Sequence, residues 1–178
     1  MRARGYTLLE ILIAVVVLAL GIIGGVALQL GALRARHQAV LLSHATQLAT
    51  SLAERMRANP SQSATYLTLN YDALAEPTPS APSSLCHGGA CDAAQLALAD
   101  LYDAKLLAKQ NLPAGRVVIC QDAGLWSGGK LRWACMGGAT APVVVKVGWR
   151  GKHPDGTPQT DAQGQHLPGV AMMVGVAP

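Results

Sequence analysis

One acidic side chain, Glu10, stands inside an apolar segment of this 178-residue sequence and is the first candidate for specific chemistry. No charged residue follows it until Arg34, so residues 11–33 form an uninterrupted apolar run. Placing a carboxylate in a membrane segment costs about 2.5 to 3.5 kcal/mol, and a cation at the same depth is its expected partner. Glu10 is therefore a candidate functional residue, and a snorkelling acid near the membrane surface is the alternative.

The apolar run is long enough to cross a membrane. Its 23 residues extend about 34 Å as an α-helix, and the hydrocarbon core of a bilayer is roughly 30 Å thick. Arg2 and Arg4 precede it, which predicts a cytoplasmic N-terminus and places the chain after Leu33 on the other side. The run is too long for a typical cleaved signal peptide and continues into further helix, whereas a plain signal anchor would fit.

The residues around Glu10 resemble a known processing signal. The string GYTLLE at 5–10, between a basic leader and an apolar helix, is similar to the class III signal of type IV pilins and pseudopilins. The resemblance implies that a prepilin peptidase cuts after Gly5 and that Tyr6 becomes the N-methylated N-terminus. It also implies that Glu10, on the same helical face as Tyr6, pairs with the N-terminal amine of a neighbouring subunit and fixes the register between subunits.

Four cysteines, Cys86, Cys91, Cys120 and Cys135, offer redox or metal chemistry. The predicted topology places them in an oxidising compartment, where an even number predicts disulfides with three possible pairings. Cys86 and Cys91 bracket a flexible loop, and Cys120 and Cys135 lie on the two arms of an expected hairpin, so we favour the pairs 86–91 and 120–135. Zinc binding by Cys86, His87 and Cys91 fits no common finger spacing, and we expect no metal site.

Catalytic motifs are not evident in the rest of the sequence. Residues 124–130 satisfy G-x-x-x-x-G-K, but Leu131 replaces the Ser or Thr that binds magnesium, and a hairpin is expected there. None of the histidines stands in a catalytic motif: His37, His44, His87, His153 and His166. The net charge of +4 is too small to indicate nucleic-acid binding. We therefore expect neither an enzyme nor a bound cofactor.

A single long helix is expected to carry Glu10. After the apolar run, side chains recur at three- and four-residue steps, which predicts an amphipathic helix; they are Leu41, Ala45, Leu48, Leu52 and Met56. Asn59-Pro60 should end it, because the residue before proline is pushed away from helical angles. We expect one helix over residues 6–58, about 80 Å long. A coiled-coil stalk is the alternative, but the heptad does not persist.

The chain should therefore divide into a cleaved leader (1–5), a transmembrane and filament-core helix (6–33), its amphipathic continuation (34–58) and a globular head (59–178). Of the whole sequence, 51% is hydrophobic but only 4% aromatic, with no Phe. Much of the apolar excess belongs to the helix. The head is left with few aromatic side chains, so disulfides would help to stabilise it.

The head is expected to be α+β. Residues 61–85 indicate an irregular loop, and Asp92 with Gln95 predicts a capping box for a short helix that ends at Leu112-Pro113. The segments 116–120 and 131–136 should form a hairpin about Gly128-Gly129. Further strands are predicted at 143–150, with one face buried, and at 169–177, after a polar loop over 151–168. The sum is a pilin-like α+β fold, with a long N-terminal helix, a short helix and an antiparallel sheet of about four strands.

Two later strings narrow the resemblance. AERMRANP at 53–60 and AAQLALADLYDAKLLAKQNLPAGRVVIC at 93–120 are similar to PilV-type minor pilins, also called type IV pilus modification proteins. The resemblance implies a minor pilin in the complex that initiates or tips the pilus, supporting pilus biogenesis and twitching motility. The alternatives are a minor pseudopilin of a type II secretion system and a DNA-uptake (competence) pilin.

The same resemblance implies partners and a location. The partners are other minor pilins, the major pilin, prepilin peptidase and the inner-membrane assembly platform, with a pilus-tip adhesin as a further candidate. The protein would cross the inner membrane once, with its N-terminus in the cytoplasm and its head in the periplasm, before it joins the pilus. Nucleic acid is not an expected partner.

Overall fold

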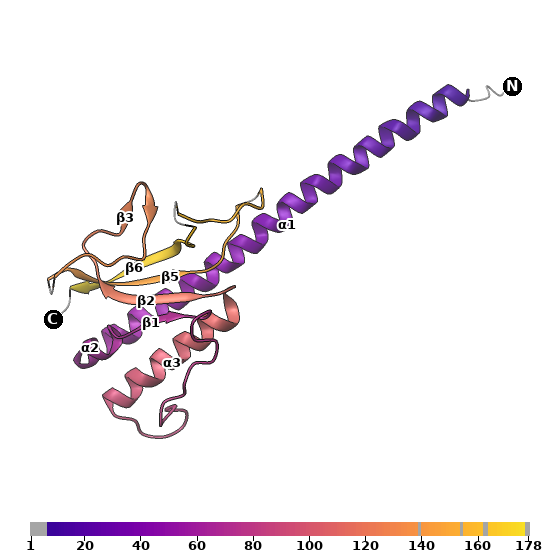
Figure 1. The fold of residues 1–178 in the computed structure, drawn as a ribbon. Coiled ribbons are helices and arrows are strands. Elements are labelled where there is room, and N and C mark those ends of the chain that lie inside the picture. Colours follow the sequence, from indigo (N-terminus) through magenta and orange to yellow (C-terminus); the bar gives the residue numbers. More distant parts are fainter. Residues whose placement is uncertain (1–6, 139, 154, 162–163, 177–178) are drawn as a thin grey trace. The chain divides into compact units, whose positions relative to one another are not determined.

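The computed structural model describes residues 7–138, 140–153, 155–161 and 164–176. The chain forms two compact units, Met1–His37 and Gln38–Pro178, and each is described by itself. Figure 1 shows the elements. In order they are α1 (Leu8–Ala58), η1 (Pro60–Gln62), α2 (Ser63–Tyr66), β1 (Asn70–Asp72), α3 (Ala93–Asn111), β2 (Arg116–Gln121), β3 (Trp126–Ser127), β4 (Lys130–Leu131), β5 (Pro142–Gly148) and β6 (Pro168–Val176). The long helix, the short helix and the antiparallel sheet match the α+β fold expected from the sequence.

The second half of α1 supplies the apolar stripe that the sequence predicts. The buried side chains of this helix are Leu41, Ala45, Leu48, Ala49, Leu52, Ala53 and Met56, which include all five predicted positions. The helix ends at Ala58 because Asn59, with φ −130° and ψ 59°, has left the helical region before Pro60. Within the unit of residues 38–178, this stripe forms part of the hydrophobic core.

The short helix α3 begins at the predicted capping box. The Asp92 carboxylate accepts a hydrogen bond from the backbone N–H of Gln95 at 2.7 Å, and the Gln95 side chain accepts from the N–H of Asp92 at 3.2 Å. Two backbone donors at the helix start are thereby satisfied. The helix stops at Asn111, since Leu112 is extended ahead of Pro113.

Four strands form one antiparallel sheet in the order β1-β2-β5-β6. The central pair is long and in register from Arg116 opposite Gly148 to Gln121 opposite Val143. Val143, Val145 and Val147 of β5 belong to the core cluster that also contains α1 and α3 side chains. Figure 1 shows α3 on one side of the sheet and the β3 hairpin on the other.

The predicted hairpin of 116–120 with 131–136 is wrong. Strand β2 pairs with β1 and β5, and the Gly128-Gly129 turn joins only the two-residue strands β3 and β4. The partner that β2 takes, β5, is valine-rich and buried along almost its whole length, whereas residues 131–133 are only partly buried and 134–136 are exposed. The Gly128-Gly129 pair correctly predicts a turn, but tertiary packing determines which strands pair with β2.

The region 61–85, predicted as an irregular loop, holds more structure than its composition indicates. It contains the rest of η1, all of α2 and the edge strand β1. Tyr66 and Tyr71 within it are fully buried. Three- and four-residue elements are too short to show a hydrophobic period, so pairing with β2 and packing against the core decide their structure.

A polar network links α1, α2 and α3 inside the unit of residues 38–178. Asp100 of α3 is 3% exposed and accepts hydrogen bonds from Arg55 and, at 2.6 Å, from the Tyr66 hydroxyl. Burial and the bond to the Asp100 carboxylate raise the pKa of Tyr66 well above its usual range. The tyrosine therefore stays a neutral donor to the carboxylate.

Candidate functional site

Thr7 caps the start of α1 and positions the backbone of Glu10. The N–H of Glu10 lies 3.3 Å from the Thr7 hydroxyl oxygen and 3.1 Å from the Thr7 carbonyl oxygen. Threonine is a preferred N-cap because its side-chain oxygen satisfies a backbone donor of the first turn. The helix thus begins at Leu8, with Glu10 in its first turn. Gly5 and Tyr6, the predicted processing residues, lie outside the described part of the chain.

Glu10 lies on an apolar face of α1. It lines a shallow groove along the helix together with Ile11, Ala14, Val15 and Leu18. Glu10, Ala14 and Leu18 are four residues apart and therefore stack on one face. Among the residues that the structure describes, no ion pair includes the Glu10 carboxylate.

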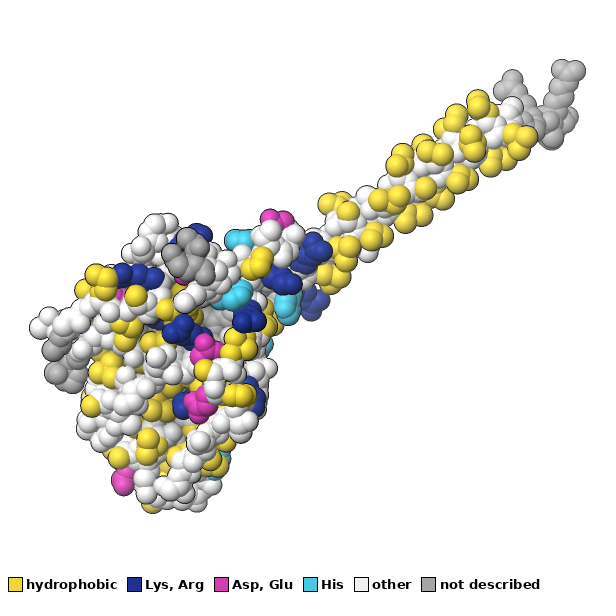
Figure 2. Space-filling view, viewed as in Figure 1, with side chains coloured by type: hydrophobic (Ala, Val, Ile, Leu, Met, Phe, Trp, Pro, Cys, Tyr) yellow, Lys and Arg dark blue, Asp and Glu magenta, His cyan; other side chains and the backbone are white. Residues whose placement is uncertain are grey.

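The first half of α1 has an exposed apolar surface. The large hydrophobic side chains of Leu8 to Leu33 have exposed fractions from 49% for Val26 to 88% for Leu8. Figure 2 shows hydrophobic side chains all along the visible face of this part of the helix. By length and composition the helix can cross a membrane, with a mean hydropathy of 3.0 in its most apolar window. Such a surface needs lipid or other helices around it.

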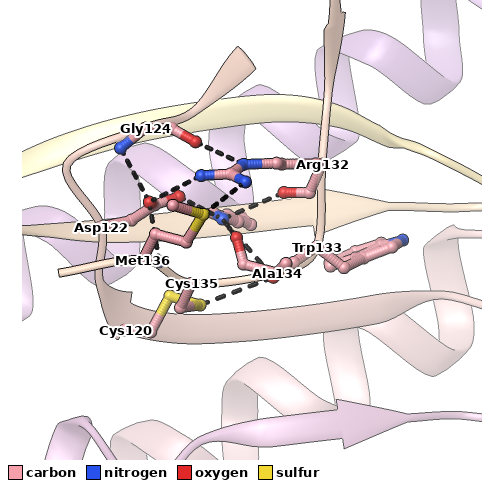
Figure 3. Close-up of a disulfide and its surroundings, with 9 residues drawn as sticks. Cys120, Asp122, Gly124, Arg132, Trp133, Ala134, Cys135 and Met136 are labelled. Carbon is pink, nitrogen blue, oxygen red and sulfur yellow. Dashed lines mark hydrogen bonds and ion pairs between the residues drawn. A yellow bond between two sulfur atoms is a disulfide. The ribbon is translucent and has the colours of Figure 1, made fainter. Parts of the chain in front are cut away.

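All four cysteines form disulfides in the unit of residues 38–178. Cys86 is joined to Cys91 with a Cα–Cα distance of 5.8 Å, and Cys120 to Cys135 with 6.3 Å. This is the pairing favoured from the sequence, although the second bridge does not connect two hairpin arms. It joins β2 to the irregular segment that follows β4 (Figure 3).

A buried ion pair on the second face of the sheet was not predicted. Lys146 of β5 and Asp122 are both 0% exposed, and their Nζ and Oδ2 atoms are 2.5 Å apart. The prediction that β5 buries one face is therefore wrong: residues 122–136 cover its other face. The one weak signal in the sequence was a lysine within a valine-rich strand, with an aspartate directly after β2, the strand that pairs with it.

The ion pair is satisfied by the backbone around it (Figure 3). The Lys146 ammonium also donates to the carbonyl oxygens of Arg132 at 3.0 Å and Ala134 at 2.9 Å. The Asp122 carboxylate accepts from the N–H groups of Gly124 at 2.9 Å and Met136 at 3.0 Å. Burial alone would raise the pKa of Asp122, but these hydrogen bonds and the Lys146 charge hold it below its ordinary value.

The remaining candidate motifs have ordinary structural settings. Gly128 and Gly129 take positive φ angles of 58° and 76° in the β3–β4 turn, so the G-x-x-x-x-G-K string does not lead into a helix. Across the described residues, no group of three or more His, Cys, Asp or Glu side chains is placed to hold a metal ion.

Comparison with known proteins gives two adjoining family matches. Residues 1–26 match the prokaryotic N-terminal methylation motif, and residues 27–102 match the family described as type IV pilin Tt1218. No curated protein and no solved structure matches the chain. The two family matches together cover residues 1–102, more than half of the sequence.

The apolar helix has a carboxylate in its first turn, and it continues as the core helix of a disulfide-bonded α+β head. These features define a membrane-anchored subunit of the pilin class. The chain belongs to the type IV pilin superfamily. This family is structural. Membership and the methylation motif imply processing by a prepilin peptidase and partners in pilus assembly.

Proposed function

We propose that this protein is a PilV-type minor pilin that takes part in the complex initiating or tipping a type IV pilus, and so supports pilus biogenesis and twitching motility. The observation that carries the proposal is the exposed apolar surface of α1 around Glu10. A bilayer can cover this surface before assembly, and the packed helices of a filament can cover it afterwards.

In this proposal Glu10 is the registration residue. Cleavage after Gly5 leaves Tyr6 with a methylated amine, and the amine of one subunit pairs with Glu10 of the next. An unpaired carboxylate in an apolar environment costs several kcal/mol, so the register that pairs it is strongly favoured.

The charges and the cysteines support the proposed arrangement across the membrane. The leader (1–5) would lie in the cytoplasm, residues 6–33 in the inner membrane, and residues 34–58 with the head (59–178) in the periplasm. Arg2 and Arg4 favour this orientation. Both disulfides lie in the head, and disulfides persist in oxidising compartments such as the periplasm. The role is structural, without catalysis or a cofactor.

The minor-pilin subtype rests on two strings that contact each other in the fold. Arg55, in the string at 53–60, binds Asp100 of α3 in the string at 93–120. Asn59 of the first string donates to the carbonyl oxygen of Ala93 of the second at 2.7 Å. Because the strings share one interface, they are expected to occur together, which supports their use as a joint signature. The proposed direct partners are other minor pilins and the major pilin.

Deletion of the gene, with complementation by the intact gene, tests the proposed function. Loss of surface pili and of twitching, with normal exoprotein secretion, is the expected result. Loss of exoprotein secretion with normal pili would instead indicate a minor pseudopilin of type II secretion. Loss of DNA uptake alone, with normal pili and twitching, would indicate a competence pilin.

A further inference from the structure

A cleft lies at one end of the sheet, where β1 and β5 finish and β2 begins. Its volume is about 280 Å³. We name it the Arg116 cleft; the lining side chains that matter here are Arg116, Arg150, Trp133, Trp149, His166 and Asp72. All of them belong to the unit of residues 38–178, away from Glu10 in the sequence. The assembly role proposed above makes no use of them.

Residues that line the cleft carry buried side-chain atoms without hydrogen-bond partners. In the described part of the chain, four buried side-chain nitrogen or oxygen atoms have no hydrogen-bond partner. Three of them belong to residues that line this cleft: Arg116 Nε, Trp149 Nε1 and His166 Nδ1. A buried polar atom without a partner destabilises the fold, so such groups in neighbouring residues call for a ligand or water.

The Arg116 guanidinium is held in position by the residues around it. It lies over the Trp133 ring, 4.5 Å from the ring centroid. The Trp133 indole N–H in turn donates to the His166 carbonyl oxygen at 2.6 Å. Glycine at 148 makes this possible, since a Cβ there would come within 2.6 Å of the Trp133 ring. Stacking fixes the plane of the guanidinium but leaves its edge for hydrogen bonds.

The chemistry of the lining selects the charge of a ligand. Arg116 and Arg150 bring two positive charges and only donors, and Trp149 Nε1 is also only a donor. Asp72 supplies one carboxylate, and its Oδ1 already accepts the N–H of Leu74 at 2.9 Å. We propose that the Arg116 cleft binds a small oxyanion, the carboxylate or phosphate group of a ligand, through the two arginines. Guanidinium groups match the geometry of both anions.

Titration of the full-length protein in a neutral detergent tests this site. Inorganic phosphate and acetate are the two probes, added separately at constant ionic strength, with tryptophan fluorescence as the readout. Saturable binding of at least one anion is expected, and the anion that binds more tightly identifies the chemical group. Arg116→Gln should weaken binding about tenfold or more, as for other hydrogen bonds to charged groups.

Two further variants make the outcome decisive. Arg150 is exposed, so Arg150→Gln should keep the fold, which circular dichroism checks. This variant should also weaken anion binding, and it therefore tests the site even if Arg116→Gln does not fold. Lys109→Gln removes the same charge from an exposed position on α3 and should leave binding within about twofold. The proposal is overturned if neither anion saturates, or if Lys109→Gln weakens binding as much as the arginine variants do.

Discussion

Asp122 and Lys146 form an ion pair in which neither side chain has exposed surface. The pair connects the centre of β5 to the segment that crosses its second face, and Cys120–Cys135 ties the same segment to β2. Two different interactions thus fasten residues 122–136 to the sheet. Trp133 of the same segment adds an aromatic contact, since it lies under the Arg116 guanidinium of β2.

Removing one member of the ion pair should strongly destabilise the protein. Lys146→Met removes the closest cation from the buried Asp122 carboxylate and leaves only the Arg132 guanidinium, 3.8 Å away. Loss of one member of a buried pair typically costs about 3–5 kcal/mol of unfolding free energy. The double variant Asp122→Asn/Lys146→Met should recover much of that loss. Denaturant unfolding of the full chain in detergent measures both. Lys105→Met, which breaks the more exposed pair with Glu76, should cost less than about 1 kcal/mol; an equal cost at both sites would contradict this account.

The same pair should make stability sensitive to acid. The folded-state pKa of Asp122 is below that of the unfolded chain, about 3.9, so its contribution is fully present above that value. The contribution is lost as the pH falls below about 4 and the carboxylate takes up a proton. Unfolding free energies measured from pH 6 downwards should fall more steeply for the native protein than for Asp122→Asn/Lys146→Met. Parallel curves would show that Asp122 is not the responsible group.

The two disulfides should contribute unequally. In the chain-entropy model, the bridge with a sequence separation of 15 stabilises by about 3 kcal/mol and the bridge with a separation of 5 by about 2 kcal/mol. Replacing Cys120 and Cys135 with serine should therefore lower the thermal midpoint more than replacing Cys86 and Cys91. Scanning calorimetry of the two double variants makes the comparison. The reverse order would mean that residues 122–136 are held mainly by Lys146.

Periodic and capping signals predicted the parts of this fold that depend on local sequence. The stripe from Leu41 to Met56 and the Asp92 capping box are local, because each is decided by residues three or four apart. The partners of β2 were not predictable in the same way. They depend on how much apolar surface each pairing buries, which a single sequence does not state.

The candidate sites differ in the same way, because some are marked by local sequence and others only by tertiary packing. Glu10 stands out in the sequence because one charge interrupts an apolar run. Lys146 does not, since a lysine in a strand is ordinarily a solvent-facing residue, and only the covering segment 122–136 makes it buried. The Arg116 cleft draws its residues from β1, β2, the end of β5 and two loops, so no sequence spacing marks it.

The proposed registration role makes Glu10 necessary for assembly but not for insertion. Glu10→Gln removes the charge with little change of shape, so membrane insertion and cleavage should continue while incorporation into pili falls at least tenfold. Immunoblots of membrane and sheared-pilus fractions measure the two steps. Glu54→Gln breaks only an exposed pair with Arg57 and should assemble normally. Normal incorporation of the Glu10 variant would exclude the role.

Processing at Gly5 is the step on which the whole account depends, and mass spectrometry of the mature N-terminus tests it most directly. The protein is purified from the membranes of cells with and without prepilin peptidase, and its N-terminal peptide is sequenced. The account predicts a chain that begins with N-methylated Tyr6 in the first cells and an uncleaved leader in the second. A leader still joined to Tyr6 in the presence of the peptidase, or a new N-terminus beyond Glu10, would contradict it.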